Sequence, residues 1–381
     1  MLMRLDLSTL RARHRLGRAR LRLRLARYWQ ANGDLDEAAR HAHRALRLLH
    51  GSPVELTGEV TLTVAEIERD RCEYASSHAR LAKLVDQLDN LPPASPAGRL
   101  LLARALTGLG DAHRRSGRYS QATQTLQRAC RLLEDAVAAQ PDLLAAALTT
   151  LAITSKEAGE FVRAQQLYTQ VERIRAETGA SDGQLADLHH NLAGLAYARQ
   201  RYPQAERHAR QAVSLRHAAG ANAATQAADR AVLAAALAAL HKFDEARLQL
   251  DQALAACKAA SPPRRYEVAV QLHNMAALDQ ACGQPQRSEQ LYRQALAIKE
   301  DLVGPDHPEV ALVANNLGTL LQQQHRAAEA ADLFRRALAI AEHSYPPGHP
   351  TTTGILGNLE ALAQLSSADV ARRCGSDRSR P

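Results

Sequence analysis

Small residues recur along this chain at a spacing that fits one face of a helix. At eight places an alanine or serine is followed seven residues later by an alanine or valine. Seven residues are about two helical turns, and successive pairs lie about 42 residues apart. A fixed period in this range predicts a solenoid of stacked helical pairs. The first members of the pairs are Ala38, Ala75, Ala122, Ala164, Ala205, Ala246, Ser288 and Ala330.

A second set of positions keeps the same period. Thirteen residues before each first member stands a leucine or methionine, and the next residue is small in every repeat, as in Leu317–Gly318. Small residues at fixed helical positions let two antiparallel helices approach closely. A glycine precedes the second helix in half of the repeats, where it favours the turn between the helices. Asp70, Gln200, His241 and His325 take the place of that glycine in the others.

The last repeats resemble the tetratricopeptide repeat family, and in particular its 42-residue kinesin-light-chain-like subtype. The resemblance lies in the stretches N-N-L-G-T-L-L at 315–321, S-E-Q-L-Y-R-Q-A-L-A-I-K-E at 288–300 and A-E-A-A-D-L-F-R-R-A-L-A-I at 328–340, and in the loops at 304–308 and 347–350. It implies an all-α, right-handed α-solenoid of about eight helical hairpins over residues 22–366. A capping helix is expected around Thr353–Leu365.

The two ends of the chain differ from the repeats. Residues 1–21 are expected to be a basic arm, since residues 1–27 hold nine arginines and one acidic residue. That segment accounts for the whole net charge of +8, so the repeats themselves are neutral. Strict alternation of arginine and leucine at 20–25 does not fit an amphipathic helix well. Residues 367–381 are expected to be a disordered tail.

The sequence contains little that points to catalysis. It has neither a glycine-rich phosphate loop nor the common metallopeptidase and hydrolase motifs, so we expect no enzyme activity, no catalytic residue, no metal and no cofactor. Five scattered cysteines, the lack of a secretory signal and the lack of a long apolar run favour a cytoplasmic bacterial protein without a membrane span. His307 and His349 stand before prolines in equivalent loops, where we expect them to cap the following helices.

Asparagines occupy one repeat position and are the first candidates for binding. Asparagine is unfavourable inside helices, so its recurrence there needs a reason. Each one precedes the leucine or methionine of the first helix, and one intervening repeat has Val232 instead. The resemblance implies that such amides line a groove and hold an extended peptide. The alternative is that they brace the neighbouring repeat. The four residues are Asn191, Asn274, Asn316 and Asn358.

A second candidate stripe lies near the end of each first helix. Its two cationic members stand in adjacent repeats of the N-terminal half and would suit an acidic ligand, although basic side chains at a helix end also interact favourably with the helix dipole. The candidates from this stripe are Arg114, Lys156, Tyr197, Gln280 and Gln322.

These features favour a non-enzymatic scaffold or adaptor that binds a protein or peptide partner in a groove of the repeat array. One alternative is a nucleic-acid-associated protein that uses the arginine arm; the lack of aromatic residues before Tyr28 argues against base stacking there. Another alternative is a partner-sensing, regulatory component of a larger bacterial system. The sequence names no particular partner.

Overall fold

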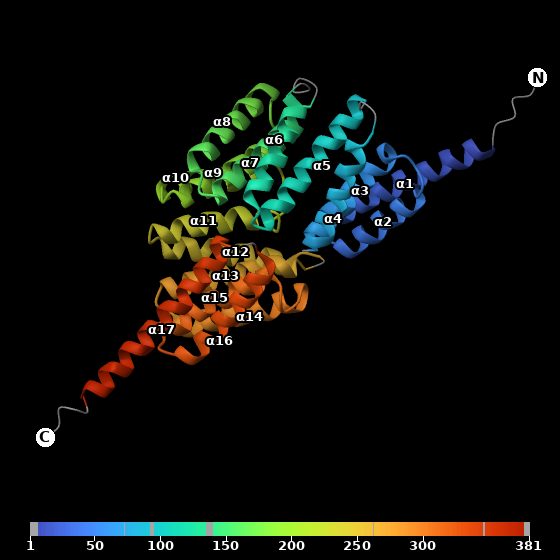
Figure 1. The fold of residues 1–381 in the computed structure, drawn as a ribbon. Helices are drawn as coiled ribbons and strands as arrows, with labels where there is room; N and C mark the ends of the chain where they lie inside the picture. The colour runs from blue at the N-terminus through green and yellow to red at the C-terminus, as the bar shows by residue number, and fades with distance from the viewer. Residues whose placement is uncertain are drawn as a thin grey trace, which may run out of the picture. The chain divides into compact units, whose positions relative to one another are not determined.

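In a computed structural model of the chain, residues 7–71, 73–91, 95–134, 140–261, 263–345 and 347–376 are described, and they form α-helices and no strand (Figure 1). Side chains are described from residue 14 to residue 364 within these ranges. The chain divides into two compact units, Met1–Gln184 (unit 1) and Leu185–Pro381 (unit 2). The predicted all-α solenoid of helical hairpins is confirmed.

Unit 1 contains four helical hairpins, each made of a first and a second helix. Their helices are α1 (Leu7–Ala31), α2 (Leu35–Leu48), α3 (Val54–Asp70), α4 (Tyr74–Asp89), α5 (Pro96–Arg115), α6 (Tyr119–Glu134), α7 (Pro141–Glu157) and α8 (Phe161–Thr178).

Unit 2 continues the same alternation and ends on a single long helix. Its elements are α9 (Asp182–Ala198), whose first turn contains the boundary between the units, α10 (Tyr202–Ala218), α11 (Ala227–Ala239), α12 (Phe243–Ala259), α13 (Arg265–Ala281), α14 (Pro285–Val303), α15 (Pro308–Gln323), α16 (Ala327–Ser344) and α17 (Pro350–Ser376).

The first helices lie in a row within each unit. α1, α3, α5 and α7 pack one on the next in unit 1, and α11, α13, α15 and α17 do so in unit 2. Within the described ranges, no such contact joins successive second helices of either unit. We call the surface formed by each row the first-helix face. Because first helices lie closer together than second helices, this face is the inner side of the curvature of each unit.

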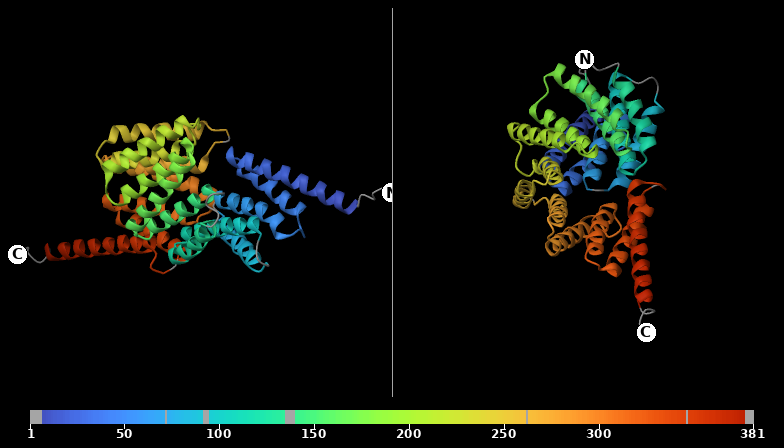
Figure 2. Two further views of the ribbon diagram at one scale, coloured as in Figure 1. Left: turned by 90° about the horizontal axis from the view of Figure 1, so that it is seen from above. Right: turned by 90° about the vertical axis from the view of Figure 1, so that its left-hand side faces the viewer.

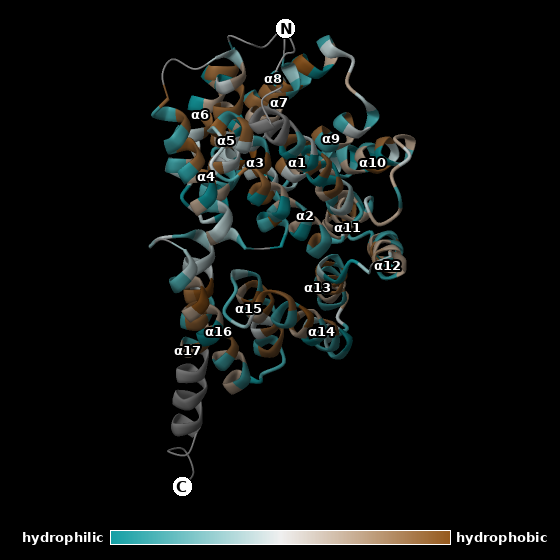
Figure 3. Cartoon of the chain, turned by 90° about the vertical axis from the view of Figure 1, so that its right-hand side faces the viewer, coloured by the Kyte–Doolittle hydropathy of each residue, from teal (hydrophilic) through white to brown (hydrophobic). Residues whose placement is uncertain are grey.

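The repeating small residues allow this close packing. Ala122, Ala205 and Ala330 are completely buried in their hairpins. A Cβ atom added at Gly318 would lie 2.8 Å from Cε1 of Phe334, and one added at Gly110 would lie 2.5 Å from Cγ of Leu126. A larger residue at either glycine would therefore force the two helices of the hairpin apart. Figure 3 shows hydrophobic residues concentrated where paired helices face each other.

The second repeat differs from the predicted register by two residues. Ala75 is exposed, while Ser77 is buried and donates from its hydroxyl to the carbonyl of Ala65 at 2.8 Å. Ser288 makes the same bond to Ala276 at 2.7 Å, so Ser77 is the true small residue of its repeat. The abundance of alanine hid this serine, whose hydroxyl is satisfied by the facing helix. The turn residue of this repeat then becomes residue 72 rather than Asp70, and it lies outside the described residues.

The turns that lack glycine keep the geometry of those that have it. Gln200, His241 and His325 adopt φ values of 58°, 59° and 61°, which fall in the left-handed region. Gly117 and Gly283, at the same repeat position, have φ values of 68° and 70°. Packing of the flanking helices therefore imposes the turn even on residues that disfavour it.

Both ends of the chain are more helical than the sequence suggested. α1 begins at Leu7 and passes through the expected boundary between arm and solenoid at residue 21. Ala19 and Ala26 on α1 are buried against α2, so the C-terminal half of the expected arm belongs to the first hairpin. α17 continues beyond the expected cap to Ser376 and extends away from α16 (Figures 1 and 2). The last five residues of the expected tail, 377–381, lie outside the described part.

Candidate peptide-binding surface

All nine candidate residues lie on first helices, as expected. Arg114 is on α5 and Lys156 on α7 in unit 1; in unit 2, α9 carries Asn191 and Tyr197, α13 carries Asn274 and Gln280, α15 carries Asn316 and Gln322, and α17 carries Asn358. Their hydrogen bonds divide them into residues that join neighbouring repeats and residues that remain available to a ligand.

Two of the asparagines connect successive first helices of unit 2. The Asn358 amide donates to Oδ1 of Asn315 at 2.9 Å, which links α17 to α15. The Asn316 amide nitrogen lies 3.2 Å from Nε2 of His273, which links α15 to α13. The Asn315 amide also donates to Oδ1 of Asn316 at 3.4 Å. These four side chains form a continuous polar ladder, so Asn316 and Asn358 brace the repeats.

The other two asparagines do not take part in this ladder. The Asn191 amide donates to the carbonyl of Asp187, one turn earlier in its own helix, at 2.8 Å. Asn274 is half-buried and makes no side-chain hydrogen bond in the described part of the chain. In the preceding repeat, the residue that corresponds to His273 is Ala231, whose side chain cannot form a hydrogen bond with Asn274. Asn274 therefore keeps its amide free for a ligand.

The second stripe divides in the same way. Gln280 donates to Oε1 of Gln323 at 2.8 Å and accepts from the Tyr292 hydroxyl at 3.3 Å. Arg114 contacts Asp111 at 2.7 Å and Glu157 of the next first helix at 2.8 Å, and it is only 12% exposed. The Arg114 guanidinium, which was predicted to contact an acidic ligand, is therefore already paired with two carboxylates of the protein.

The side chains of Lys156, Tyr197 and Gln322 have no hydrogen-bond partner within the described ranges. The Tyr197 side chain is 42% exposed and its ring lies 5.4 Å from that of Tyr202. Burial, assisted by Arg114 but opposed by Glu157, lowers the pKa of Lys156. These three residues, with Asn274, are the candidates that can still contact a ligand.

One spacing explains which residues are engaged. The pairs Arg114–Glu157, His273–Asn316, Gln280–Gln323 and Asn315–Asn358 are each separated by 43 residues. The repeats are about 42 residues long. A side chain on one first helix therefore contacts the next first helix at the residue that follows its own repeat equivalent. The asparagine position was found from the sequence, but its partners were missed, because they stand one residue earlier and vary in type.

His273 also belongs to a buried polar group that the sequence did not reveal. Burial, together with the nearby Lys299 ammonium, lowers the pKa of His273 to about 4. Lys299 is itself buried and forms an ion pair with Glu309. His307 and His349 cap the following helices as predicted, since their Nδ1 atoms accept from the backbone NH groups of Glu309 and Thr351 at 3.2 Å and 3.1 Å.

The first-helix face of unit 1 contains a hollow of about 310 Å³ between α3, α5 and α7, and residues of the second helices α4 and α6 also line it. Its apolar lining includes Leu62, Leu81, Leu133, Leu143 and Ala146, and its charged lining includes Glu66, Arg69, Arg104, Asp111 and Arg115.

Glu66 is the one acidic side chain of this hollow that has no hydrogen bond or ion pair in the described structure. Burial raises its pKa, although Arg69, Arg104 and Arg27 act in the opposite direction. Arg115, by contrast, pairs with Asp111 at 2.9 Å and lies over the Tyr74 ring. Sequence reasoning missed the hollow, because its residues come from several helices and share no repeat position.

The stacked hairpins, with their row of first helices and the polar ladder between them, place the chain among helical repeat solenoids. Models of the tetratricopeptide repeat family match residues 105–136, 185–219 and 267–343. The chain contains tetratricopeptide repeats in these segments. The second helices of its last two hairpins begin at Pro285 and Ala327, at the 42-residue spacing of the kinesin-light-chain-like subtype. Comparison with curated proteins finds no match.

Several solved structures share this fold. The apo form of the quorum sensor NprR from B. thuringiensis is 14% identical, with a TM-score of 0.60 over 84% of this chain and 87% of that one. The Rap conjugation gene regulator of plasmid pLS20, in complex with the Phr* peptide, is also 14% identical, with a TM-score of 0.60 over 81% and 84%. A Rap protein complexed with competence and sporulation factor is 14% identical, with a TM-score of 0.55 over 85% and 92%.

Proposed function

We propose that this chain is a non-enzymatic scaffold that binds an extended peptide segment of a protein partner on its first-helix face. The observation that carries this proposal is the hollow between α3, α5 and α7 of unit 1. It combines an apolar lining with charged residues from α3 and α5, which is the composition expected of a site that buries one anchoring side chain and orients the rest of a ligand.

The unpaired side chains support the proposal. Glu66 offers a carboxylate beside the apolar lining, and a basic group of a peptide would satisfy it. In unit 2, Asn274, Tyr197 and Gln322 can offer hydrogen bonds to a peptide backbone. Asn316, Asn358, Gln280 and Arg114 would contribute less, because a ligand would have to break their bonds between repeats.

The neighbours in fold suggest the kind of probe to use. The Rap conjugation gene regulator of plasmid pLS20 is by name a complex with the Phr* peptide, and another Rap protein is complexed with competence and sporulation factor. Their likeness to this chain is one of fold, and fold alone does not determine function. It nevertheless makes short peptides a sensible first probe, and it keeps a regulatory, partner-sensing role within this proposal.

The proposal is tested by selecting displayed random peptides against the whole protein. We expect the selected peptides to bind the Ala146→Trp variant at least tenfold more weakly, because the exposed Ala146 lines the hollow and a tryptophan there would fill it. The matched control is Ala255→Trp, at an exposed alanine on the second helix α12. Titration of a fluorescent peptide measures both affinities.

Two results would contradict this site. Equal affinity of the selected peptides for both tryptophan variants would place the binding elsewhere. Enrichment of no peptide after repeated selection would argue against peptide binding as such. Circular dichroism and thermal unfolding of each variant show whether a loss of affinity reflects a loss of fold.

A further inference from the structure

The first hairpin, α1 and α2, is strongly basic. Its described side chains, residues 14–50, include nine arginines and three acidic residues, a net charge of +6. The nine are Arg15, Arg18, Arg20, Arg22, Arg24, Arg27, Arg40, Arg44 and Arg47. The excess thus extends from the arm seen in the sequence onto the second helix.

The three acidic residues of this hairpin are all engaged. Asp34 caps α2 by accepting from the Glu37 backbone NH at 3.0 Å. Asp36 pairs with Arg71, which also contacts Glu73 at 2.7 Å. Glu37 pairs with Arg40 at 2.8 Å. Their carboxylates therefore leave most of the arginine charge uncompensated.

Six arginines of the hairpin are exposed and form no ion pair with any side chain in the described ranges. Four of them stand within ten residues of α1, a length of about 14 Å along a helix. The other two lie on α2, one turn apart. They are Arg15, Arg18, Arg20, Arg24, Arg44 and Arg47.

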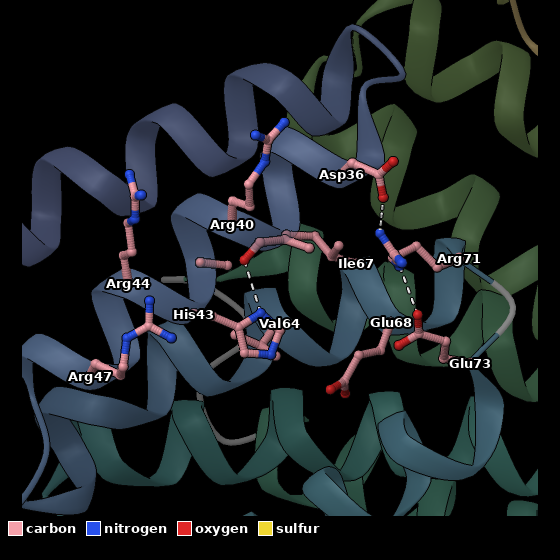
Figure 4. A pocket seen from close by; sticks show the side chains of 12 residues that line it. Asp36, Arg40, His43, Arg44, Arg47, Val64, Ile67, Glu68, Arg71 and Glu73 are labelled. Atoms are coloured by element: carbon pink, nitrogen blue, oxygen red, sulfur yellow. Dashed lines mark hydrogen bonds and ion pairs between the residues drawn. The ribbon is translucent and has the colours of Figure 1, made fainter.

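The α2 arginines border a hollow of about 620 Å³ that is also lined by α3. Figure 4 shows Arg44 and Arg47 at one end of this hollow and the Asp36–Arg71–Glu73 chain of ion pairs at the other, with Arg40 between them. Val64 and Ile67 lie in its floor. One end is therefore rich in unpaired guanidinium groups, which are suited to phosphate oxygens.

We propose that the first hairpin binds the phosphate backbone of duplex DNA through these six arginines. Duplex DNA carries about one negative charge per 1.7 Å of its axis, so several phosphates come within reach of arginines that are this close together along the hairpin. This contact is independent of base sequence, because guanidinium–phosphate bonds carry no base information. It would operate in addition to the peptide binding proposed above and uses none of the same residues.

Two other polyanions fit the structure less well. A helix that lies on an anionic membrane needs an apolar face for the bilayer, but Leu16, Ala19, Leu23 and Ala26 of α1 pack against α2 and its neighbours. An acidic protein surface would be expected to meet apolar anchors among the charges. Among the described side chains of the hairpin, the exposed large apolar residues are Leu21 and Tyr28 on α1, and α2 has none beside Arg44 and Arg47.

The test measures binding of a fluorescent 20-base-pair DNA duplex by anisotropy, with the full chain, between 50 and 200 mM NaCl. For six phosphate contacts, we expect log K to fall against log salt with a slope of about −5. The variant Arg44→Gln with Arg47→Gln should lessen this slope by about 2. The variant in which Arg15, Arg18, Arg20 and Arg24 become glutamine should lessen it by about 4.

The matched control is Arg131→Gln with Arg207→Gln, at exposed arginines that also have no ion pair in the described part but stand on other helices. It should bind DNA as the wild type does. Glutamine is a good helix former, and circular dichroism checks that each variant stays folded. A control that loses as much affinity as the α2 variant would overturn the proposal, as would unchanged slopes in both hairpin variants.

Competitors decide the class of ligand. We expect unlabelled DNA duplex to displace the probe at lower charge concentration than polyglutamate or vesicles of anionic lipid. Tighter binding of polyglutamate would assign the surface to an acidic protein, and tighter binding of the vesicles would assign it to a membrane. An RNA duplex that competes more than tenfold better than DNA would also overturn the choice of DNA.

Discussion

The two units hold their first helices together by different chemistry. In unit 1, the link from α5 to α7 is ionic: Arg114 spans Asp111 and Glu157. In unit 2, the links from α13 to α15 and from α15 to α17 are made by amides and an imidazole, through His273, Asn316, Asn315 and Asn358. The same repeat geometry thus accepts either solution, and the two should respond differently to pH and salt.

The largest expected difference is in acid. Burial and Lys299 hold the pKa of His273 at about 4, below the ordinary value of 6.5. Below pH 6.5, His273 is protonated in the unfolded chain but stays neutral in the folded chain. The free energy of unfolding therefore decreases as the pH falls from about 7 to about 4. The full loss is on the order of 3 kcal/mol. Urea unfolding at pH 7 and pH 5 measures the larger part of this loss, about 2 kcal/mol.

The variant His273→Asn isolates this effect, because asparagine keeps a polar partner for Asn316 without titrating. Its stability should vary less between pH 7 and pH 5 than that of the wild type. An identical pH dependence in the two proteins would show that folding does not lower the pKa of His273. The Arg114–Asp111 ion pair of unit 1 should not add to the pH dependence of stability between pH 7 and pH 5, since Arg114 and Arg115 lower the pKa of Asp111 despite its burial.

A smaller effect is expected from Glu157→Gln, which removes the charge that Arg114 contacts across repeats. Hydrogen bonds to charged groups contribute about 1.5–3 kcal/mol, and Asp111 still pairs with Arg114 in this variant. We therefore expect a loss of about 1–2 kcal/mol in 50 mM NaCl and less in 1 M NaCl, where exposed charges are screened. A loss that is independent of salt would mean that packing, rather than charge, holds α5 to α7.

The smallest effects are expected from the asparagines. Asn316→Ala and Asn358→Ala should each lower stability by about 0.5–1.5 kcal/mol, the usual net value of a hydrogen bond, and salt should not alter this loss. Asn274→Ala should leave stability unchanged or raise it by a few tenths of a kcal/mol, since alanine is the better helix former. Equal destabilisation by all three would contradict the division between bracing and free asparagines.

The sequence predicted the repeats well, because small residues at the close contacts recur about every 42 residues. It misplaced one repeat by two residues, since Ser77 does at that contact what alanine does elsewhere. It also left the asparagine question open, and the structure shows why. Whether an asparagine braces the neighbouring repeat depends on the residue 43 positions earlier, which is His273 for Asn316 but Ala231 for Asn274. The hollow around Glu66 has no repeating signature and could be found only from the packed helices.

The 43-residue pairing bears on how such an array can grow. When a stretch of 42 residues is duplicated in tandem, the new copy carries both halves of the ladder: an asparagine that reaches back and a polar residue that receives the next one. Each duplication thus adds a bonded rung without any new mutation. A gain or loss of one residue within a repeat moves the two halves out of step. Selection on the ladder would therefore conserve repeat length even where side chains are free to change.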